Sequence, residues 1–392
     1  MHGTTCRPQL VCFSHLRWDF VYQRPQHLLS RAARDHDVYF IEEPVFEAGA
    51  TPHLRTSPRP EGVTVVLPVL PTGSEAGMAE ALRPLLRRLL PSGPARRTLW
   101  YYTPMAVAFS RDIPADVVVY DNMDELTGFL GAPAHLLALE AELFARADLV
   151  FTGGMSLYRA KRHRHPSVHA FPSSIDKAHF ARARGTVAEP ADQRAIPGPR
   201  AGFFGVIDER MDVGLLARTA ARCPDWQFVM IGPVVKIDPA GLPRQPNIHW
   251  LGPKAYRDLP DYIAGWTVGL MPFALNEATR FISPTKTPEF LAAGVPVVST
   301  AITDVVSPYG DKGLVAIAGD DAGLADSLET LRRRPRAPWL AAVDRHLAGM
   351  SWDRTWADMQ HLMLGVGQAT QPKVEAARST ARQVMVGEEA HV

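Results

Sequence analysis

The hydrophobic pattern of the first half of the chain consists of short apolar runs that alternate with polar loops and helical patterns. The first run, residues 9–14, is followed by a polar loop, a helical pattern at 28–34 and a second apolar run at 38–41. Strand, helix and strand in this order form a βαβ unit, because parallel pairing needs a crossover. Further runs of this type lie at 63–67, 99–102, 117–120, 149–152 and 168–171, and the clearest helical pattern spans 133–146. The pattern predicts a Rossmann-like first domain.

The second half repeats this alternation without repeating individual residues. Strand-type runs lie at 201–205, 228–231, 248–251, 268–271, 295–299 and 314–317, and helical patterns at 212–221 and 324–333. Residues 182–200 are rich in alanine, proline and charge and show no periodicity, which is typical of a linker. We therefore predict an α/β chain of two facing Rossmann-like domains with a cleft between them. The expected units are a first domain at 1–180, a linker at 181–199, a second domain at 200–350, a C-terminal helix at 351–366 and an unstructured tail at 367–392.

The stretch at 283–300, SPTKTPEFLAAGVPVVST, carries the clearest chemical signal. Thr285 is placed to cap a short helix that Gly294 ends, and a buried strand follows. Lys286 and Glu289 are three residues apart and lie on one helix face, beside free backbone N–H groups that favour an anion. A cation for phosphate and a carboxylate for vicinal ribose hydroxyls describe a nucleotide site. The structural alternative is an exposed ion pair on a capped helix.

The segment PEFLAAGVPVVST resembles the donor-binding motif of retaining nucleotide-sugar glycosyltransferases of the GT-B fold, of the glycosyltransferase family 4 type. In that family, the glutamate that matches Glu289 holds the donor ribose. Phe281 stands where the family pattern has a second glutamate, and the nearest upstream acid is Glu277. The first-domain segment HLRWDFVYQRPQHLL also resembles bacterial polysaccharide-assembly glycosyltransferases of this kind. The resemblance implies transfer of a hexosyl group with retention, from a nucleotide diphosphate-sugar to an acceptor hydroxyl.

The resemblance also implies where the donor binds. In RAGFFGVIDERMDVGLL, Glu209 and Arg210 match the family's glutamate-lysine pair, while Val206 stands at the family's first basic position. Arg210 therefore carries the diphosphate role in this loop, for which a planar guanidinium is suited; the structural alternative is pairing with Asp208 or Asp212. Residues 252–256 match the loop that holds the nucleobase, and Tyr256 is placed to stack on the base or to pack at a helix start. The expected donor-binding residues are Gly205, Asp208, Arg210, Gly252, Lys254, Tyr256, Asn276, Glu277, Thr285, Lys286, Thr287 and Glu289.

Two first-domain loops follow predicted strands, where ligands bind in open parallel sheets. We expect His15, Asp19, Arg24 and His27 on the acceptor side, and Asp121 or Asp124 as a general base toward the acceptor hydroxyl. Helix capping by either aspartate is the alternative for that pair. With Arg210 and Lys286 stabilising the leaving diphosphate, the expected catalytic residues are Asp121, Asp124, Arg210 and Lys286.

Composition excludes several other classes of protein. A net charge of +1 gives no reason to expect nucleic acid as a partner, and three cysteines without C-x-x-C spacing favour a reducing compartment over a disulfide framework. No signal peptide and no run long enough to span a membrane is evident. We expect a cytoplasmic protein that needs no metal or cofactor, with a UDP-sugar as co-substrate and a sugar or lipid-linked acceptor. The oligomeric state is left open.

Leucines 82, 85, 86, 89 and 90 form an apolar stripe beside three arginines. Such a helix either rests on the inner membrane face or packs against a core, and packing is the more common case. Two rival functions remain: a GT-B epimerase or hydrolase acting on a nucleotide sugar, and an inactive GT-B partner protein, which Val206 and Phe281 favour. A nicotinamide oxidoreductase lacks its glycine fingerprint here.

Overall fold

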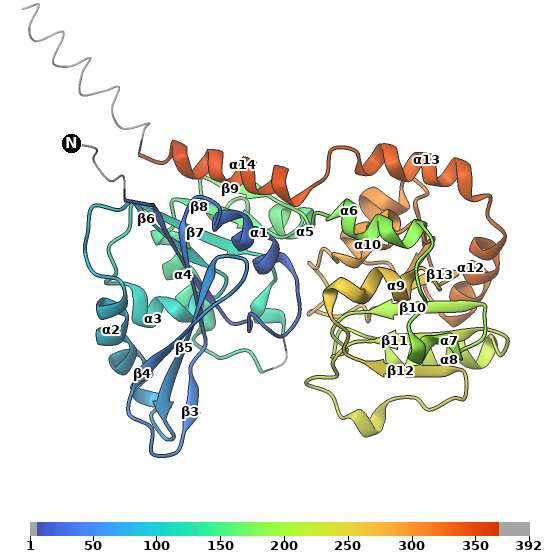
Figure 1. Ribbon diagram of the computed structural model, residues 1–392, viewed down its shortest axis with the longest axis horizontal. Coiled ribbons are helices and arrows are strands. Elements are labelled where there is room, and N and C mark those ends of the chain that lie inside the picture. The colour runs from blue at the N-terminus through green and yellow to red at the C-terminus, as the bar shows by residue number, and fades with distance from the viewer. Residues whose placement is uncertain (1–5, 130, 368–392) are drawn as a thin grey trace, which may run out of the picture.

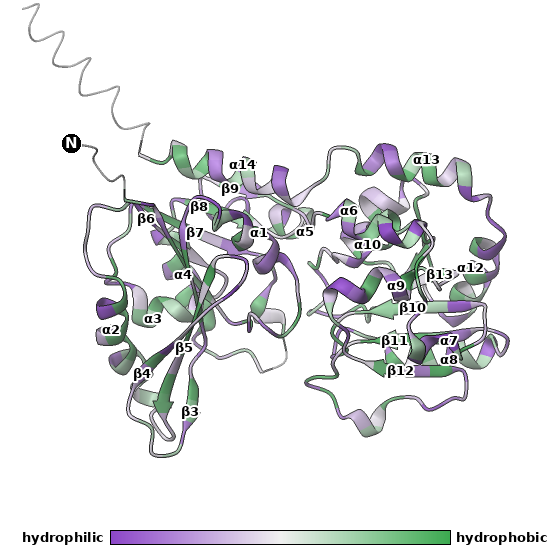
Figure 2. Cartoon of the chain, viewed as in Figure 1, coloured by the Kyte–Doolittle hydropathy of each residue, from purple (hydrophilic) through white to green (hydrophobic). Residues whose placement is uncertain are grey.

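The computed structural model describes residues 6–129 and 131–367, which fold into two α/β lobes lying side by side (Figure 1). This described part of the chain contains two separate sheets, one in each lobe. In Figure 2 many of the strands inside the lobes are coloured as hydrophobic, whereas the peripheral helices show both hydrophobic and hydrophilic residues. This is the expected distribution for sheets that are covered by helices.

The first lobe is built on a nine-stranded sheet in the described residues, in the order β3-β5-β2-β1-β6-β7-β8-β9, with β4 paired to β5. Its strands are β1 (Gln9–Ser14), β2 (Asp37–Glu42), β3 (Val45–Glu47), β4 (His53–Pro58), β5 (Val63–Pro71), β6 (Arg97–Tyr101), β7 (Val117–Asn122), β8 (Leu149–Thr152) and β9 (Val168–Ala170). β1 pairs in parallel with both β2 and β6, so the strand order reverses beside β1. The predicted Rossmann-like core is therefore present.

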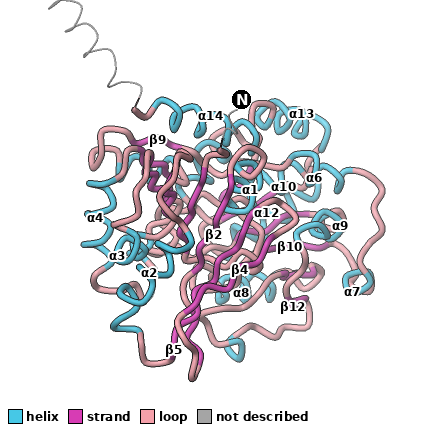
Figure 3. The backbone as a smooth tube through the Cα atoms, turned by 60° about the vertical axis from the view of Figure 1, so that its left-hand side comes forward, coloured by secondary structure: helices cyan, strands magenta, loops and turns pink. Residues whose placement is uncertain are grey.

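Two strands, β3 and β4, were not predicted from the sequence. β4 pairs antiparallel with β5, and most of its residues are exposed. Because it buries so little, its sequence HLRTSP carries no apolar run. β4 and the neighbouring part of β5 project beyond the helices of this lobe, as Figures 1 and 3 both show.

Five α-helices of the described chain cover the first sheet: α1 (Arg24–Ala32), α2 (Met78–Leu89), α3 (Val107–Ser110), α4 (Leu136–Arg146) and α5 (Met155–Lys161). The leucine stripe lies on α2 and continues to its C-terminal end. Leu82, Leu86 and Leu90 are buried in a core with residues of β1 and β6, and Leu85 and Leu89 pack against its edge. The stripe is thus the packed face of a surface helix, which accounts for it without a membrane.

The second lobe holds a six-stranded, all-parallel sheet in the order β12-β11-β10-β13-β14-β15. Its strands are β10 (Arg200–Phe204), β11 (Gln227–Ile231), β12 (Ile248–Gly252), β13 (Val268–Met271), β14 (Val297–Ser299) and β15 (Val315–Ile317). The helices of this half are α8 (Val213–Arg222), α9 (Leu259–Ile263), α10 (Lys286–Ala292), α11 (Thr303–Val305), α12 (Asp321–Arg333) and α13 (Arg336–Leu347). Gly294 follows α10 with a φ of +76°, as predicted for a terminating glycine.

The segment expected to be an irregular linker is instead folded onto the second lobe. It contains a 3-10 turn and α7 (Ala191–Arg194), and α6 (Lys177–Ala181) ends at its first residue. Ile175 and Phe180, which precede the predicted boundary, belong to the core of the second lobe, and the side chain of Gln193 is buried and accepts a hydrogen bond from Trp266 Nε1 at 2.8 Å. These contacts join residues far apart in the sequence, so no local periodicity reveals them.

The C-terminal helix α14 (Trp352–Gly365) returns to the first lobe, whereas α13 lies on the second (Figure 1). Trp352, Trp356, Met359 and Met363 are buried in the core beneath α1. Asp353 accepts hydrogen bonds from Arg31 and Arg34 of the first lobe at 2.9 and 2.8 Å. The end of the described chain therefore connects both lobes. The predicted tail, 367–392, lies almost entirely outside the described residues.

Candidate functional site

A cavity of about 410 Å³ lies between the two lobes. The second lobe lines it with residues that follow β10, β11, β12 and β13 and with the first turn of α10. The first lobe contributes residues that follow β1, β7, β8 and β9. The carboxyl edges of two parallel sheets thus face one another across the cavity, which is where ligands bind in open α/β folds.

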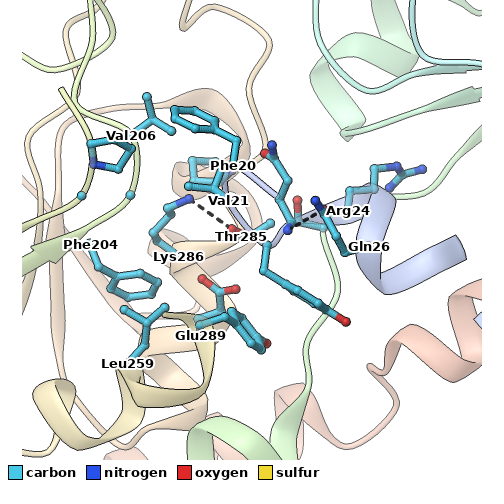
Figure 4. A pocket seen from close by; sticks show the side chains of 18 of the residues that line it. Phe20, Val21, Arg24, Gln26, Phe204, Val206, Leu259, Thr285, Lys286 and Glu289 are labelled. Atoms are coloured by element: carbon cyan, nitrogen blue, oxygen red, sulfur yellow. Dashed lines mark hydrogen bonds between the residues drawn. The ribbon is translucent and has the colours of Figure 1, made fainter. Parts of the chain in front are cut away.

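The first turn of α10 presents the two residues that the sequence singled out. Lys286 and Glu289 both line the cavity, and their side chains lie next to each other in Figure 4. Glu289 is only 5% exposed, so the predicted alternative of an exposed ion pair does not apply. Thr285 occupies the N-cap position without a side-chain capping bond; its hydroxyl instead accepts a hydrogen bond from Lys286 Nζ at 3.4 Å. The backbone N–H groups of this turn therefore remain without a side-chain cap.

The pKa values of this pair are set by burial and by each other. Burial raises the pKa of Glu289 from 4.5 to about 7, and the neighbouring Lys286 and Thr285 oppose this rise. Burial lowers the pKa of Lys286, which the charge of Glu289 opposes. A carboxylate in a cleft whose pKa is raised to near 7 is a feature often found at functional sites.

Gly205, at the end of β10, makes room for Lys286. A Cβ atom on Gly205 would lie 2.6 Å from Lys286 Cε and 3.2 Å from Nζ, and its φ of +142° is rarely adopted by other residues. The lysine side chain therefore crosses the backbone at the strand end. A glycine is needed here because any larger side chain would collide with Lys286.

Arg210 reaches the cavity while paired with Asp208, the alternative that the sequence left open. Its guanidinium donates to both carboxylate oxygens of Asp208, with distances of 2.7 to 3.1 Å. Asp208 is 3% exposed and does not line the cavity. The pair fixes the direction of the guanidinium, and Arg210 also lies 5.6 Å from the ring of Phe129 of the first lobe. Asp208 therefore positions the cation and does not contact a ligand itself.

Tyr256 lines the cavity, but its ring is not available for stacking on a nucleobase. It is stacked between Tyr22, at 4.5 Å and 25°, and His179, at 4.3 Å and 11°. His179 Nε2 also contacts the backbone oxygen of Tyr256 at 3.0 Å. Both faces of the Tyr256 ring are therefore covered by protein side chains, an arrangement that fits the packing interpretation and leaves no open face for a nucleobase. The neighbouring Lys254 lines the cavity and donates to Asp192 at 2.6 Å.

The two aspartates after β7 are placed differently. Asp121 is fully buried inside the strand and accepts hydrogen bonds from Arg24 at 3.0 and 2.9 Å. Arg24 also donates to the backbone oxygen of Phe171 at 2.8 Å. Asp121 therefore acts through a buried ion pair and does not reach the cavity, whereas Asp124 lines it. Burial raises the pKa of Asp124, and the charge of Arg210 opposes this rise.

Of the remaining residues predicted on the acceptor side, one lines the cavity and two do not. Asp19 lines the cavity and accepts hydrogen bonds from Arg59 at 2.6 and 3.1 Å. His15 and His27 do not line it. His27 is buried and stacked on Trp352 at 4.7 Å, and burial lowers its pKa. Burial and the charge of Lys236 lower the pKa of His15 to about 4, and its Nδ1 atom is buried without a hydrogen-bond partner.

Four other predicted donor residues lie outside the cavity lining. Gly252 ends β12, and its backbone oxygen accepts a hydrogen bond from Gly232. Thr287 is buried against Met271. Asn276 donates to the backbone oxygen of Glu209, and the Glu277 side chain is 74% exposed beside Arg280.

Several cavity residues were missed by the sequence analysis. Gly153, Ser173 and Gly232 follow β8, β9 and β11, so the rule that ligands lie beyond strand ends would have found them. Glu61 lies in the turn between β4 and β5, and no sequence pattern marked it. Ser173 also joins the lobes, because its hydroxyl donates to the backbone oxygen of Ser283 at 2.6 Å.

Two negative findings apply to residues 6–129 and 131–367. No group of three or more His, Cys, Asp or Glu side chains there is arranged to hold a metal ion. No helix in these ranges is both long and apolar enough to cross a bilayer.

Comparison with known proteins agrees with this geometry. Residues 198–334 match the family described as glycosyl transferases group 1. TuaH of Bacillus subtilis (strain 168), named as a glycosyltransferase of teichuronic acid biosynthesis, is 27% identical over 237 residues; the match spans 56% of this chain and 59% of the length of TuaH.

Solved structures of similar architecture cover almost the whole chain. Sucrose-phosphate synthase from Thermosynechococcus elongatus has a TM-score of 0.69 at 14% identity, over 93% of this chain and 100% of that one. Anabaena Alr3699/HepE, solved in complex with UDP and glucose, has a TM-score of 0.63 at 14% identity, over 90% of this chain and 98% of that one. Residues 198–334 are therefore a group 1 glycosyl transferase domain, set within a two-lobed chain of the GT-B fold.

Proposed function

We propose that this protein is a glycosyltransferase that moves a sugar from a nucleotide diphosphate-sugar, with UDP as the nucleotide, to an acceptor hydroxyl. One observation carries the proposal: Lys286 and Glu289 sit on an uncapped helix turn inside a cavity, with Arg210 on the same wall and a second lobe opposite. Similarity to TuaH and to a UDP-bound neighbour supports both the activity and the donor class.

The donor would lie along the second lobe. The diphosphate would take the backbone N–H and the ammonium group of Lys286 together with the guanidinium of Arg210, and Glu289 would accept hydrogen bonds from the ribose hydroxyls. As the bond to the sugar breaks, negative charge grows on the diphosphate, and these fixed cations stabilise it more than they stabilise the intact donor. Lys286 matters most, because in the described structure Arg210 shares its charge with Asp208.

The acceptor would enter from the first lobe. Asp124 is a first-lobe carboxylate that lines the cavity just after β7, and the charges of Arg210 and Lys286 act on its pKa. We assign it the role of contacting the transferred sugar or the attacking hydroxyl. Retention of configuration follows from the resemblance to family 4 and is part of the proposal. The acceptor would be a saccharide or lipid-linked saccharide of surface-polymer assembly, made from cytoplasmic nucleotide sugars.

Nucleotide binding and turnover test the proposal together. UDP should raise the melting temperature more than GDP or ADP, and UDP-sugar should release UDP when acceptor is present. Lys286→Met should weaken UDP binding roughly 10- to 150-fold, the value of a charge-assisted hydrogen bond of about 1.5 to 3 kcal/mol. Lys312→Met is the matched control, since Lys312 is exposed beside His346. Equal UDP affinity in both variants would contradict the assignment.

An inactive GT-B partner protein is the second candidate. Val206 favours it, because this apolar side chain lines the cavity where the family pattern has a cation. Such a protein would bind UDP and lose that binding in the Lys286 variant, yet release no UDP from a UDP-sugar with any acceptor. A hydrolase would release UDP without an acceptor, whereas an epimerase would convert one UDP-sugar into another with no net release of UDP. Analysis of both UDP and UDP-sugar after the reaction therefore separates these candidates.

A further inference from the structure

The first-lobe wall of the cavity has an unusual balance of charge. Among the described residues that line it from this lobe, three are carboxylates, Asp19, Glu61 and Asp124, and one is a cation, Arg24. An acceptor that enters from this side therefore meets mainly hydrogen-bond acceptors of negative charge.

The single cation on this wall is already committed. The guanidinium of Arg24 donates from Nε and Nη2 to the two oxygens of Asp121 and from Nη1 to the backbone oxygen of Phe171. Arg24 is only 5% exposed, and its partner Asp121 is fully buried. Turning this guanidinium toward an anionic ligand would leave a buried carboxylate unpaired, which is strongly unfavourable. Arg24 therefore offers no binding site for a phosphate.

The other cations near the cavity do not change this result. Arg59 neutralises Asp19 through two hydrogen bonds but is not a lining residue, and Glu61 and Asp124 keep the wall negative. On the opposite wall Arg210 and Lys254 are paired with carboxylates, and Lys286 lies at the predicted diphosphate position. Donor diphosphate would add further negative charge to the same cavity.

The wall also carries features that suit a neutral sugar. Phe20 is 46% exposed and lines the cavity together with Gln23. An exposed aromatic ring accepts the C–H face of a pyranose, while carboxylate and amide oxygens accept hydrogen bonds from its hydroxyls. In Figure 4, Phe20, Arg24 and Gln26 mark this first-lobe side of the cavity, with Phe204 and Lys286 on the second-lobe side.

We propose that the reacting unit of the acceptor is an uncharged saccharide, and that Glu61 and Asp124, the lining carboxylates that Arg59 does not neutralise, exclude sugar phosphates from this position. The inference rests on the proposed function, because it assumes that the second lobe holds the donor diphosphate. It concerns the sugar that enters the cavity, so a phosphate elsewhere on a longer acceptor is compatible with it.

The test uses the full chain saturated with UDP and matched pairs of probes that differ by one phosphate. Glucose with glucose 6-phosphate, mannose with mannose 6-phosphate, and N-acetylglucosamine with its 6-phosphate are compared by saturation-transfer NMR, and as acceptors with UDP-glucose. The neutral member should bind or react better in each pair. The variant Glu61→Gln should shift the neutral-to-phosphate ratio toward the phosphate by roughly two- to fivefold.

Glu80→Gln is the control, since Glu80 is an exposed α2 carboxylate away from the cavity, and it should leave the ratio unchanged. Saturable binding of a sugar phosphate to the UDP-loaded wild type that equals or exceeds that of its neutral partner would overturn the proposal. So would an unchanged ratio in Glu61→Gln. Failure of UDP itself to bind, measured first, would count against the proposed function, and is thereby separated from failure of the acceptor assignment.

Discussion

Replacing Glu289 with glutamine removes a carboxylate that the fold buries on the first turn of α10. The side chain keeps its shape and one acceptor oxygen but can no longer ionise. Because the pKa of Glu289 is raised from 4.5 to about 7, the folded protein retains a proton that the unfolded chain has released between these values. The contribution of Glu289 to the free energy of unfolding of the wild type therefore falls as the pH rises from 4.5 to 7 and is level above that range.

The size of this effect follows from the pKa shift. With these pKa values, the raised pKa of Glu289 destabilises the folded state by about 1 kcal/mol at pH 5 and by about 3 kcal/mol at pH 8. Relative to wild type, Glu289→Gln should thus gain roughly 2 to 3 kcal/mol of stability between pH 5 and pH 8. For a domain of this size, the melting temperature of Glu289→Gln minus that of wild type should be about 5 to 10 °C larger at pH 8 than at pH 5.

Thermal melts of both proteins without nucleotide, at several values between pH 5 and pH 8, measure this difference. Glu277→Gln is the matched control, because its side chain is 74% exposed in the same lobe, and its difference from wild type should stay level. UDP binding should be weakened in Glu289→Gln even as the apo protein gains stability. If the melting-temperature difference between Glu289→Gln and wild type changes with pH no more than that of the control does, the claim that burial raises the pKa of Glu289 is refuted.

Three further substitutions test the surroundings of the site. Arg24→Met leaves Asp121 buried and unpaired, so unfolding experiments should show a loss of about 3 to 5 kcal/mol, and a loss below 1 kcal/mol would mean that water reaches the pair. Tyr22→Ala removes one face of the Tyr256 sandwich and should weaken UDP binding about 2- to 10-fold in calorimetry; an unchanged affinity would show that the base-side loop holds its place alone. Gly205→Ala puts a methyl group against the cavity lysine at a strained φ, so UDP binding should fall while circular dichroism stays native; normal binding would place that lysine elsewhere.

Local patterns determined much of the fold. The apolar runs at 9–14, 149–152 and 268–271 coincide with β1, β8 and β13, because strands buried on both faces need apolar side chains at successive positions. The position of Lys286 and Glu289 on one helix face was likewise predictable, since they are three residues apart whatever surrounds the helix. These features depend on neighbours a few residues away, and a sequence contains those neighbours explicitly.

Only the tertiary structure decided which polar residues face the cavity. β7 continues to Asn122, so Asp121 is a strand residue whose partner Arg24 is 97 positions away, while Asp124 lies beyond the strand and reaches the cavity. The ring of Tyr256 is covered on one face by a tyrosine of the other lobe and on the other face by a histidine of α6. Burial, pairing and accessibility depend on what packs against a side chain from distant parts of the chain, and the sequence order alone does not specify that packing.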